Sequence, residues 1–227
     1  MRSAVLYVVT GTLLLLVVGV GCSKNEPTKT APADTSAADS EEATLPDKPT
    51  QAPDQFTVEL DTTKGPIVID VHREWSPHGV DRFYELVNDG YYNDVAFFRV
   101  IDGFMAQVGI SGDPAENAVW RQKRIPDDPV KGSNTRGMVS FAMSGPDSRT
   151  TQFFINFTNN SNLDAMGFSP FGEVKDMTAV DALYSGYGEG APRGRGPSQG
   201  AMQAQGNSYL RESFPKLDYI KSAKIVN

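Results

Sequence analysis

Residues 97–107 of this 227-residue chain read Phe-Phe-Arg-Val-Ile-Asp-Gly-Phe-Met-Ala-Gln, which sets a cation and an amide among large apolar side chains. Asp102-Gly103 is typical of a turn between two strands. Because successive side chains of a strand face opposite sides, Arg99 and the two phenylalanines before it cannot all point the same way. Arg99 lies either on the wet face of a half-buried sheet or in the lining of a pocket, and this stretch alone leaves both readings open.

Further blocks follow along the chain. Residues 137–146 read Gly-Met-Val-Ser-Phe-Ala-Met-Ser-Gly-Pro and residues 152–155 read Gln-Phe-Phe-Ile, followed by Asn-Leu-Asp at 162–164 and Phe-Gly-Glu-Val at 171–174. Together with the first stretch they resemble the cyclophilin-type peptidyl-prolyl cis-trans isomerases, in the family's order and at nearly its spacing. The resemblance extends from about Phe56 to the C-terminus.

The N-terminus has the pattern of a targeting segment. Arg2 supplies a positive charge, residues 4–20 are almost wholly apolar, and Cys22, the only cysteine, follows at once. A membrane-spanning helix needs about 20 apolar residues, so the run is slightly short for one. Small residues before a lone cysteine resemble the bacterial lipobox, although Gly19 stands where that motif prefers leucine. We expect a lipoprotein signal peptide at 1–21 and lipidation of Cys22, the alternative being an uncleaved membrane anchor.

Residues 22–55 differ in composition from both of their neighbours. They consist mainly of Pro, Thr, Ala, Ser, Asp and Glu, with no aromatic residue. Such a segment cannot bury enough apolar surface to offset chain entropy, which predicts a disordered tether. Residues 56–227 have a length suited to one domain with its own core. Either reading of the N-terminus places this domain outside the cytoplasm, so we expect a location in the bacterial cell envelope, facing the periplasm or the exterior.

Apolar alternation and turn residues predict a mainly β domain. The expected strands cover 56–60, 67–71, 95–100, 104–108, 138–142, 152–157, 171–174 and 222–226. Ser76, whose hydroxyl can cap a free amide, and Pro77 predict the start of a helix that ends near Gly90, and a second short helix is expected at 178–184. The pattern leaves a sandwich or a barrel open. The resemblance implies a closed eight-stranded antiparallel β-barrel with an α-helix over each open end.

Composition and motifs argue against several other functions. With 21 basic and 28 acidic residues the net charge is −7, which disfavours nucleic-acid binding. The Gly-rich stretch 185–200 lacks the Lys-Ser/Thr pair of a phosphate-binding loop, so a mobile surface loop is expected there. His72 and His78 are the only histidines and have no cysteine nearby, so neither a metal site nor a cofactor is expected.

The resemblance also implies roles for individual residues. Arg99, Gln107 and Gln152 match the catalytic positions, where the guanidinium stabilises the twisted amide and the two amides orient it and the substrate carbonyl. Met143 stands where the family usually has asparagine, and Phe168 is the best match to the family's pocket histidine in a loop one residue longer. The substrate-binding residues that the resemblance implies are Phe104, Met105, Ala142, Met143, Phe154, Leu163 and Phe168.

The predicted function is therefore peptidyl-prolyl cis-trans isomerisation in exported or envelope proteins during folding. The partners are proline-containing polypeptides and, through Cys22, a membrane, with a monomer as the expected state. The alternative is a non-catalytic cyclophilin-like module that binds proline-containing segments. Retention of Arg99 and Gln152 favours the enzyme over the module.

Overall fold

The computed structural model describes residues 51–226. The predicted signal peptide, Cys22 and most of the tether lie outside this range. Within it, none of the helices has the length and apolar character needed to cross a bilayer. Packing begins just before the first strand, at Ala52, which is buried and whose amide donates to Asp81 Oδ1 over 3.0 Å.

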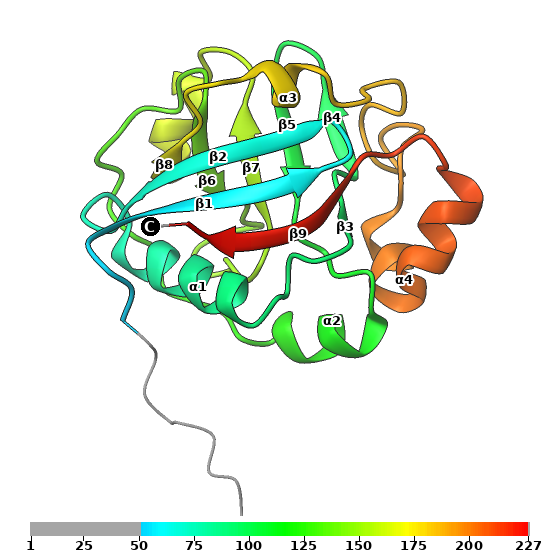
Figure 1. The fold of residues 1–227 in the computed structure, drawn as a ribbon, viewed down its shortest axis with the longest axis horizontal. Coiled ribbons are helices and arrows are strands. Elements are labelled where there is room, and N and C mark those ends of the chain that lie inside the picture. The colour runs from blue at the N-terminus through cyan, green and yellow to red at the C-terminus, as the bar shows by residue number, and fades with distance from the viewer. Residues whose placement is uncertain (1–50, 227) are drawn as a thin grey trace, which may run out of the picture. The chain divides into compact units, whose positions relative to one another are not determined.

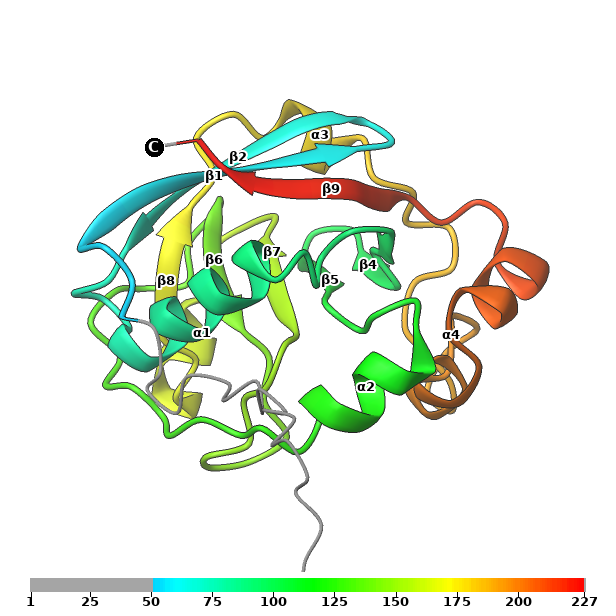
Figure 2. The same cartoon turned by 60° about the horizontal axis from the view of Figure 1, so that its bottom comes forward.

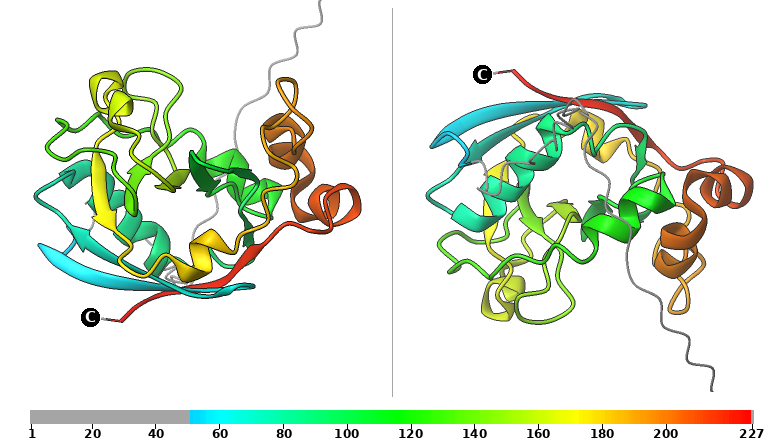
Figure 3. Two further views of the ribbon diagram at one scale, coloured as in Figure 1. Left: turned by 90° about the horizontal axis from the view of Figure 1, so that it is seen from above. Right: turned by 90° about the horizontal axis from the view of Figure 1, so that it is seen from below.

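Within residues 51–226, nine strands form a single antiparallel sheet (Figure 1). They are β1 (Gln55–Thr62), β2 (Gly65–His72), β3 (Val95–Ala96), β4 (Arg99–Ile101), β5 (Met105–Val108), β6 (Met138–Phe141), β7 (Phe153–Asn156), β8 (Pro170–Glu173) and β9 (Tyr219–Ile225). Their order across the sheet is β3-β9-β1-β2-β8-β6-β7-β5-β4, so β3 and β4 are its two edges although they are neighbours in sequence. Figure 3 shows how the sheet curls on itself into a half-barrel.

The closed eight-stranded barrel is not confirmed, because the strand expected at 95–100 is interrupted. Phe97 and Phe98 are both buried, but Phe97 packs into the main core while Phe98 packs with Met202 and Leu210. The strand is interrupted at this pair, with β3 before it joined to β9 and β4 after it joined to β5. Because only Phe97 and Phe98 separate β3 from β4 along the chain, the two edges of the sheet are joined by the backbone and not by a hydrogen-bonded ladder.

Helix α1 (Pro77–Asn88) forms where the sequence predicts it, with Pro77 in its first turn, but its cap is not the expected one. Ser76 donates its hydroxyl to Asp128 Oδ2 over 2.6 Å instead of capping the helix itself. The Asp128 carboxylate accepts the amides of His78 and Gly79 at 3.1 and 2.9 Å. The helix N-terminus is therefore capped by a loop residue distant in sequence, which pattern reading cannot find.

The other helices are only partly as expected. The second expected helix is confirmed in shorter form as α3 (Thr178–Asp181), whereas α2 (Pro114–Trp120), α4 (Gln199–Ser213) and the 3-10 helix η1 (Ser161–Met166) were not predicted. Helix α4 escapes prediction because it bends at Gly206, which has φ of +59° and lies against the carbonyl of Gly112. Figure 3 shows α4 beside α2, outside the curl of the sheet.

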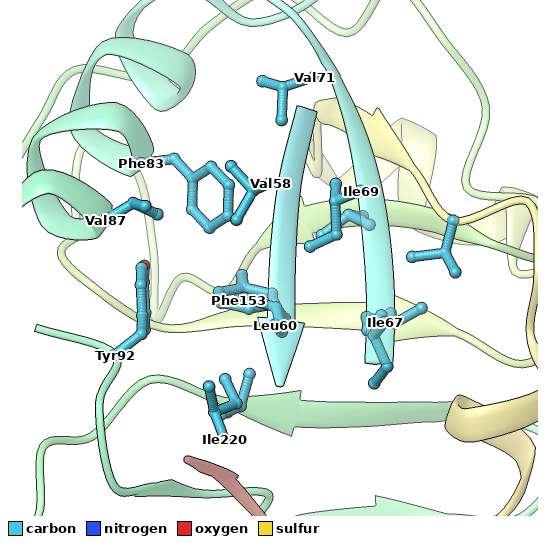
Figure 4. Packing of buried hydrophobic residues seen from close by; sticks show 14 of the residues in the cluster. Val58, Leu60, Ile67, Ile69, Val71, Phe83, Val87, Tyr92, Phe153 and Ile220 are labelled. Carbon is cyan, nitrogen blue, oxygen red and sulfur yellow. The ribbon is translucent and has the colours of Figure 1, made fainter. Parts of the chain in front are cut away.

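The main core lies between the sheet and α1, which runs alongside β9 and β8 (Figure 2). Figure 4 shows inward side chains of β1 and β2, such as Leu60 and Ile69, facing Phe83 of α1 and Phe153 of β7. These four residues are fully buried. Alternation along β1 and β2, buried on one face and more exposed on the other, is the pattern that the sequence shows.

Candidate active site

Arg99 and Gln107 face each other on neighbouring strands. Strand register places Arg99 of β4 directly opposite Gln107 of β5, and Gln107 opposite Phe154 of β7. Arg99 Nη1 donates to Gln107 Oε1 over 3.0 Å. Because the two residues are cross-strand partners, the sheet itself fixes the pairing of guanidinium and amide.

The contact continues as a chain of amide hydrogen bonds. Gln107, which is only 6% exposed, donates through Nε2 to Gln152 Oε1 over 2.9 Å. Gln152 Nε2 lies 3.3 Å from Gln199 Oε1 at the start of α4. We call Arg99, Gln107 and Gln152 the relay. It brings together the three residues for which the family resemblance implies a catalytic role.

An apolar cluster lies beside the relay. Met105, Phe154 and Leu163 are buried together, with Phe104, Ala142 and Phe168 packed against them. The rings of Phe154 and Phe168 meet edge to face, with centroids 5.6 Å apart. Arg99 Cζ lies 5.8 Å from the centroid of the Phe104 ring, so the cation borders the apolar surface directly.

This cluster and Arg99 line one cavity of about 620 Å³. Its lining includes Arg99, Gln107 and all of the predicted substrate-binding residues: Phe104, Met105, Ala142, Met143, Phe154, Leu163 and Phe168. Gln152 lies at a neighbouring pocket of about 280 Å³, whose lining includes Arg121 and Arg124 but no acidic residue. The arrangement combines an apolar hollow with one fixed cation, which suits a ligand with a small apolar ring next to a carbonyl.

A group of hydrogen-bonded polar residues anchors the segment that carries Leu163 and Phe168. The carboxylate of Asp164, in η1, accepts hydrogen bonds from Ser133 Oγ and from the backbone and side-chain nitrogens of Asn134. Burial raises the pKa of Asp164, but these donors outweigh it and the pKa lies below its ordinary value. Asn134 Nδ2 also donates to the Phe168 carbonyl over 2.8 Å. Asn134, which is fully buried, thus ties the loop carrying Phe168 to the sheet.

Comparison with known proteins identifies the family of this chain. A family model described as cyclophilin type peptidyl-prolyl cis-trans isomerase/CLD matches residues 57–195. The chain belongs to the cyclophilin family. Peptidyl-prolyl cis-trans isomerase-like 3 of Homo sapiens is 37% identical over 136 residues, covering 56% of this chain and 81% of the relative. Peptidyl-prolyl cis-trans isomerase B of Escherichia coli is 35% identical over 136 residues, covering 56% and 82%.

A solved structure shows the same fold at low identity. The crystal structure of a cyclophilin type isomerase of Cryptosporidium parvum matches with a TM-score of 0.57 at 21% identity. The match covers 76% of this cyclophilin and 98% of the other chain. At that identity the similarity supports the fold of the domain and nothing finer.

One cavity residue of this cyclophilin that the sequence does not single out is Glu189. Its carboxylate accepts Arg99 Nε and Nη2, each over 2.7 Å, in a two-pronged ion pair. The hydrogen bond from Arg99 is the largest cause that lowers the pKa of Glu189. Glu189 belongs to the Gly-rich stretch that the sequence predicts to be a mobile surface loop. The stretch is a loop, but it lies at the active site and lines the cavity with residues 189–193.

The sequence does not predict the ion pair between Glu189 and Arg99, because a single acidic residue between two glycines is not part of any periodic pattern. The two histidines also have no part in the cavity lining, and His72 stacks on Trp75 with centroids 4.1 Å apart. Within residues 51–226 no group of three or more His, Cys, Asp or Glu side chains is placed to hold a metal ion.

Proposed function

We infer that the chain is a peptidyl-prolyl cis-trans isomerase and that Arg99 is its principal catalytic residue. The observation that carries this inference is the position of Arg99, bonded to Gln107 at the edge of an apolar cavity lined by Phe104 and Phe154. Membership of the cyclophilin family supports the same activity.

The reaction makes and breaks no covalent bond. Rotation about an X-Pro bond is opposed by amide resonance, with a barrier of ~18–20 kcal/mol, and takes tens to hundreds of seconds without a catalyst. A turnover of about 10 per second requires roughly a thousandfold acceleration, or about 4 kcal/mol at 1.36 kcal/mol per tenfold. A few well-placed contacts that favour the twisted amide are sufficient for that amount.

Arg99 is suited to stabilise the twisted state. When the C–N bond is perpendicular, the prolyl nitrogen regains a lone pair and can accept a hydrogen bond that the planar amide cannot. A guanidinium is always charged and presents several donors in a rigid plane. A hydrogen bond to a charged group contributes about 1.5–3 kcal/mol, which is a large share of the required 4 kcal/mol.

The apolar cluster would hold the proline ring. Met105, Phe154 and Leu163 are buried and present carbon to the cavity, which favours a ring without polar atoms. Ala142 and Met143 line the same cavity beside Gln107, where an extended peptide can pass from the hollow to the neighbouring pocket. We propose that Ala142 and Met143 bind the peptide chain and that the apolar cluster binds the proline ring.

The test is a proline-isomerisation assay on the full chain with Arg99 replaced. We expect Arg99→Ala to lower kcat/KM at least tenfold, about 1.4 kcal/mol, with Arg99→Lys intermediate because it keeps the charge but loses the planar fork. Arg136→Ala is the control, since Arg136 is exposed, pairs with Asp181 and does not line the cavity. A chain that binds proline peptides but does not accelerate isomerisation would leave only the binding module.

We further propose that the domain acts outside the cytoplasm on exported or envelope proteins. This proposal is supported by the sequence alone, namely Arg2, the apolar run at 4–20 and the lone Cys22. If Cys22 carries the lipid anchor, Cys22→Ala will move the protein from the membrane fraction to the soluble fraction of the expressing bacterium. Retention of the variant in the membrane would favour an uncleaved anchor.

A further inference from the structure

We propose that residues 188–197 form a lid over the catalytic cavity and that Glu189 is its latch, competing with the substrate for Arg99. The inference rests on the proposed isomerase function, in which Arg99 donates to the substrate. In this inference Glu189 limits the reaction rate because it binds the Arg99 guanidinium and also lines the catalytic cavity.

Most of the hydrogen-bond donors of Arg99 are already occupied by neighbouring side chains. A guanidinium has five N–H donors. Glu189 takes one from Nε and one from Nη2, and Gln107 takes one from Nη1. A second Nη1 contact reaches Met105 Sδ, a weak acceptor, at 3.8 Å. Within the described part of the chain, these contacts leave one Nη2 donor for a substrate while Glu189 is bound.

The second observation is that the lid is bonded mainly to itself. The amide of Gly196 donates to the Glu189 carbonyl over 2.8 Å, and the amide of Ala191 donates to the Gly196 carbonyl over 3.1 Å. Gly194 donates to the Gly190 carbonyl over 3.0 Å. The loop therefore depends on few contacts outside itself, so that release of Glu189 would free it both to leave the cavity and to open its own hydrogen bonds.

The contacts that hold the lid closed are few. Gly188 forms an isolated bridge with Val100 of β4 at the lid's base. Among residues 51–226, the hydrogen bonds between residues 189–197 and the sheet, apart from this bridge, are the two that Arg99 donates to Glu189. Ala191, Pro192 and Arg193 line the cavity yet are solvent-exposed, whereas Gly196 and Pro197 at the end of the lid are buried. Little buried surface therefore opposes opening of the part of the lid that carries Ala191, Pro192 and Arg193.

The third observation is where the lid lies. Residues 189–193 form part of the lining of the same cavity as Phe104, Met105 and Phe154. They include Ala191-Pro192, which is itself an X-Pro sequence and so belongs to the class that the cavity is proposed to bind. A bound peptide and the closed lid therefore require the same donors and part of the same space.

The expected consequence is that the closed state lowers the apparent activity. When only a fraction of the molecules is competent, the apparent affinity falls by that fraction. A latch that keeps about nine molecules in ten closed would reduce kcat/KM by about tenfold. Because Arg99 and Glu189 are 23% and 34% exposed, salt should weaken their attraction and favour the open state.

The experiment compares Glu189→Gln and Glu189→Ala with wild type in the full chain. We expect kcat/KM on a proline peptide to rise about three- to tenfold in both variants, and 0.5 M salt to raise it in wild type but not in either variant. Glu212→Gln is the matched control, since Glu212 is exposed on α4 and is not part of the cavity lining. An unchanged or lower kcat/KM in both Glu189 variants would overturn the latch, and a fall would make Glu189 a positioning residue for Arg99.

Hydrogen exchange provides a readout that does not depend on activity. The amides of Ala191, Gly194 and Gly196 should exchange faster in Glu189→Ala and in wild type saturated with a proline peptide than in wild type alone. Exchange that stays equal in all three samples would show that the segment does not open. If wild type proves inactive, the proposed function fails, whereas the exchange of Glu189→Ala still decides whether Glu189 holds the lid.

Discussion

Replacing Gln107, the central residue of the relay, tests whether Arg99 must be oriented by the sheet to act in catalysis. Gln107 accepts from Arg99 Nη1 over 3.0 Å and donates to Gln152 over 2.9 Å, and it is almost fully buried. Gln107→Leu keeps nearly the same side-chain volume but removes both hydrogen bonds. The guanidinium then loses the acceptor that the sheet register supplies, while its charge and its contact with Phe104 remain.

The expected cost follows from the bond that is lost. A hydrogen bond to a charged group contributes about 1.5–3 kcal/mol, but Arg99 stays in place through its other contacts, so only part of this appears in the rate. We expect kcat/KM to fall about 10- to 50-fold, or roughly 1.4–2.3 kcal/mol. The free energy of unfolding should change by less than about 1 kcal/mol, because Arg99 and Gln152 are not fully buried and water can replace the lost partner.

The measurement is isomerisation of a proline peptide by the full chain, together with urea unfolding of the same samples. Gln205→Leu, on the exposed side of α4, is the matched control and should leave both quantities unchanged. A folded Gln107→Leu variant with the wild-type rate would refute the reasoning, because it would show that Arg99 needs no orientation by the sheet.

Three other predictions concern stability and specificity. Asp128→Ala should cost about 3–5 kcal/mol in urea unfolding, since it leaves Arg149, 3% exposed, without its 2.9 Å partner. Burial raises the pKa of Asp128, but its hydrogen bonds lower it more. The contribution should therefore be complete above the unfolded pKa of about 3.9 and disappear as the pH falls through the lower folded value, so the difference between variant and wild type should shrink there. Asn134→Ala should raise KM and lower stability by about 1–3 kcal/mol, because it leaves buried polar partners unsatisfied, as kinetics and thermal melts would show. Arg121 and Arg124 line a pocket without acidic residues, so peptides with Glu near the proline should be turned over faster than matched Gln peptides, and Arg124→Ala should reduce that ratio.

The sequence was a good guide wherever a residue's neighbours are set by strand register. Arg99, Gln107 and Phe154 lie on three adjacent strands, and the two-residue period of each strand determines which side chains meet. The pocket residues came from the family resemblance, and the structure brings them to one cavity. This agreement extends to Met143 and Phe168, where the chain departs from the family pattern.

Contacts made by loop residues could not be predicted from the sequence. Asp128 caps α1 and Glu189 pairs with Arg99 across 90 residues of sequence. Neither position has a period or a neighbouring motif that points to its partner. The break at Phe97 was also hidden, because two successive phenylalanines fit a buried strand as well as a corner between two clusters.

The small energy that this reaction requires explains why one carboxylate can influence it strongly. Acceleration by about a thousandfold corresponds to roughly 4 kcal/mol, and a single charged hydrogen bond supplies a large part of that. A competitor that occupies two of the five guanidinium donors therefore acts on the main source of catalysis. Gln107 and Glu189 bind the same cation with opposite effects, since Gln107 fixes its direction without neutralising it, whereas Glu189 offsets its charge and takes its donors. The balance between these two acceptors determines how many N–H donors of Arg99 are available to the substrate.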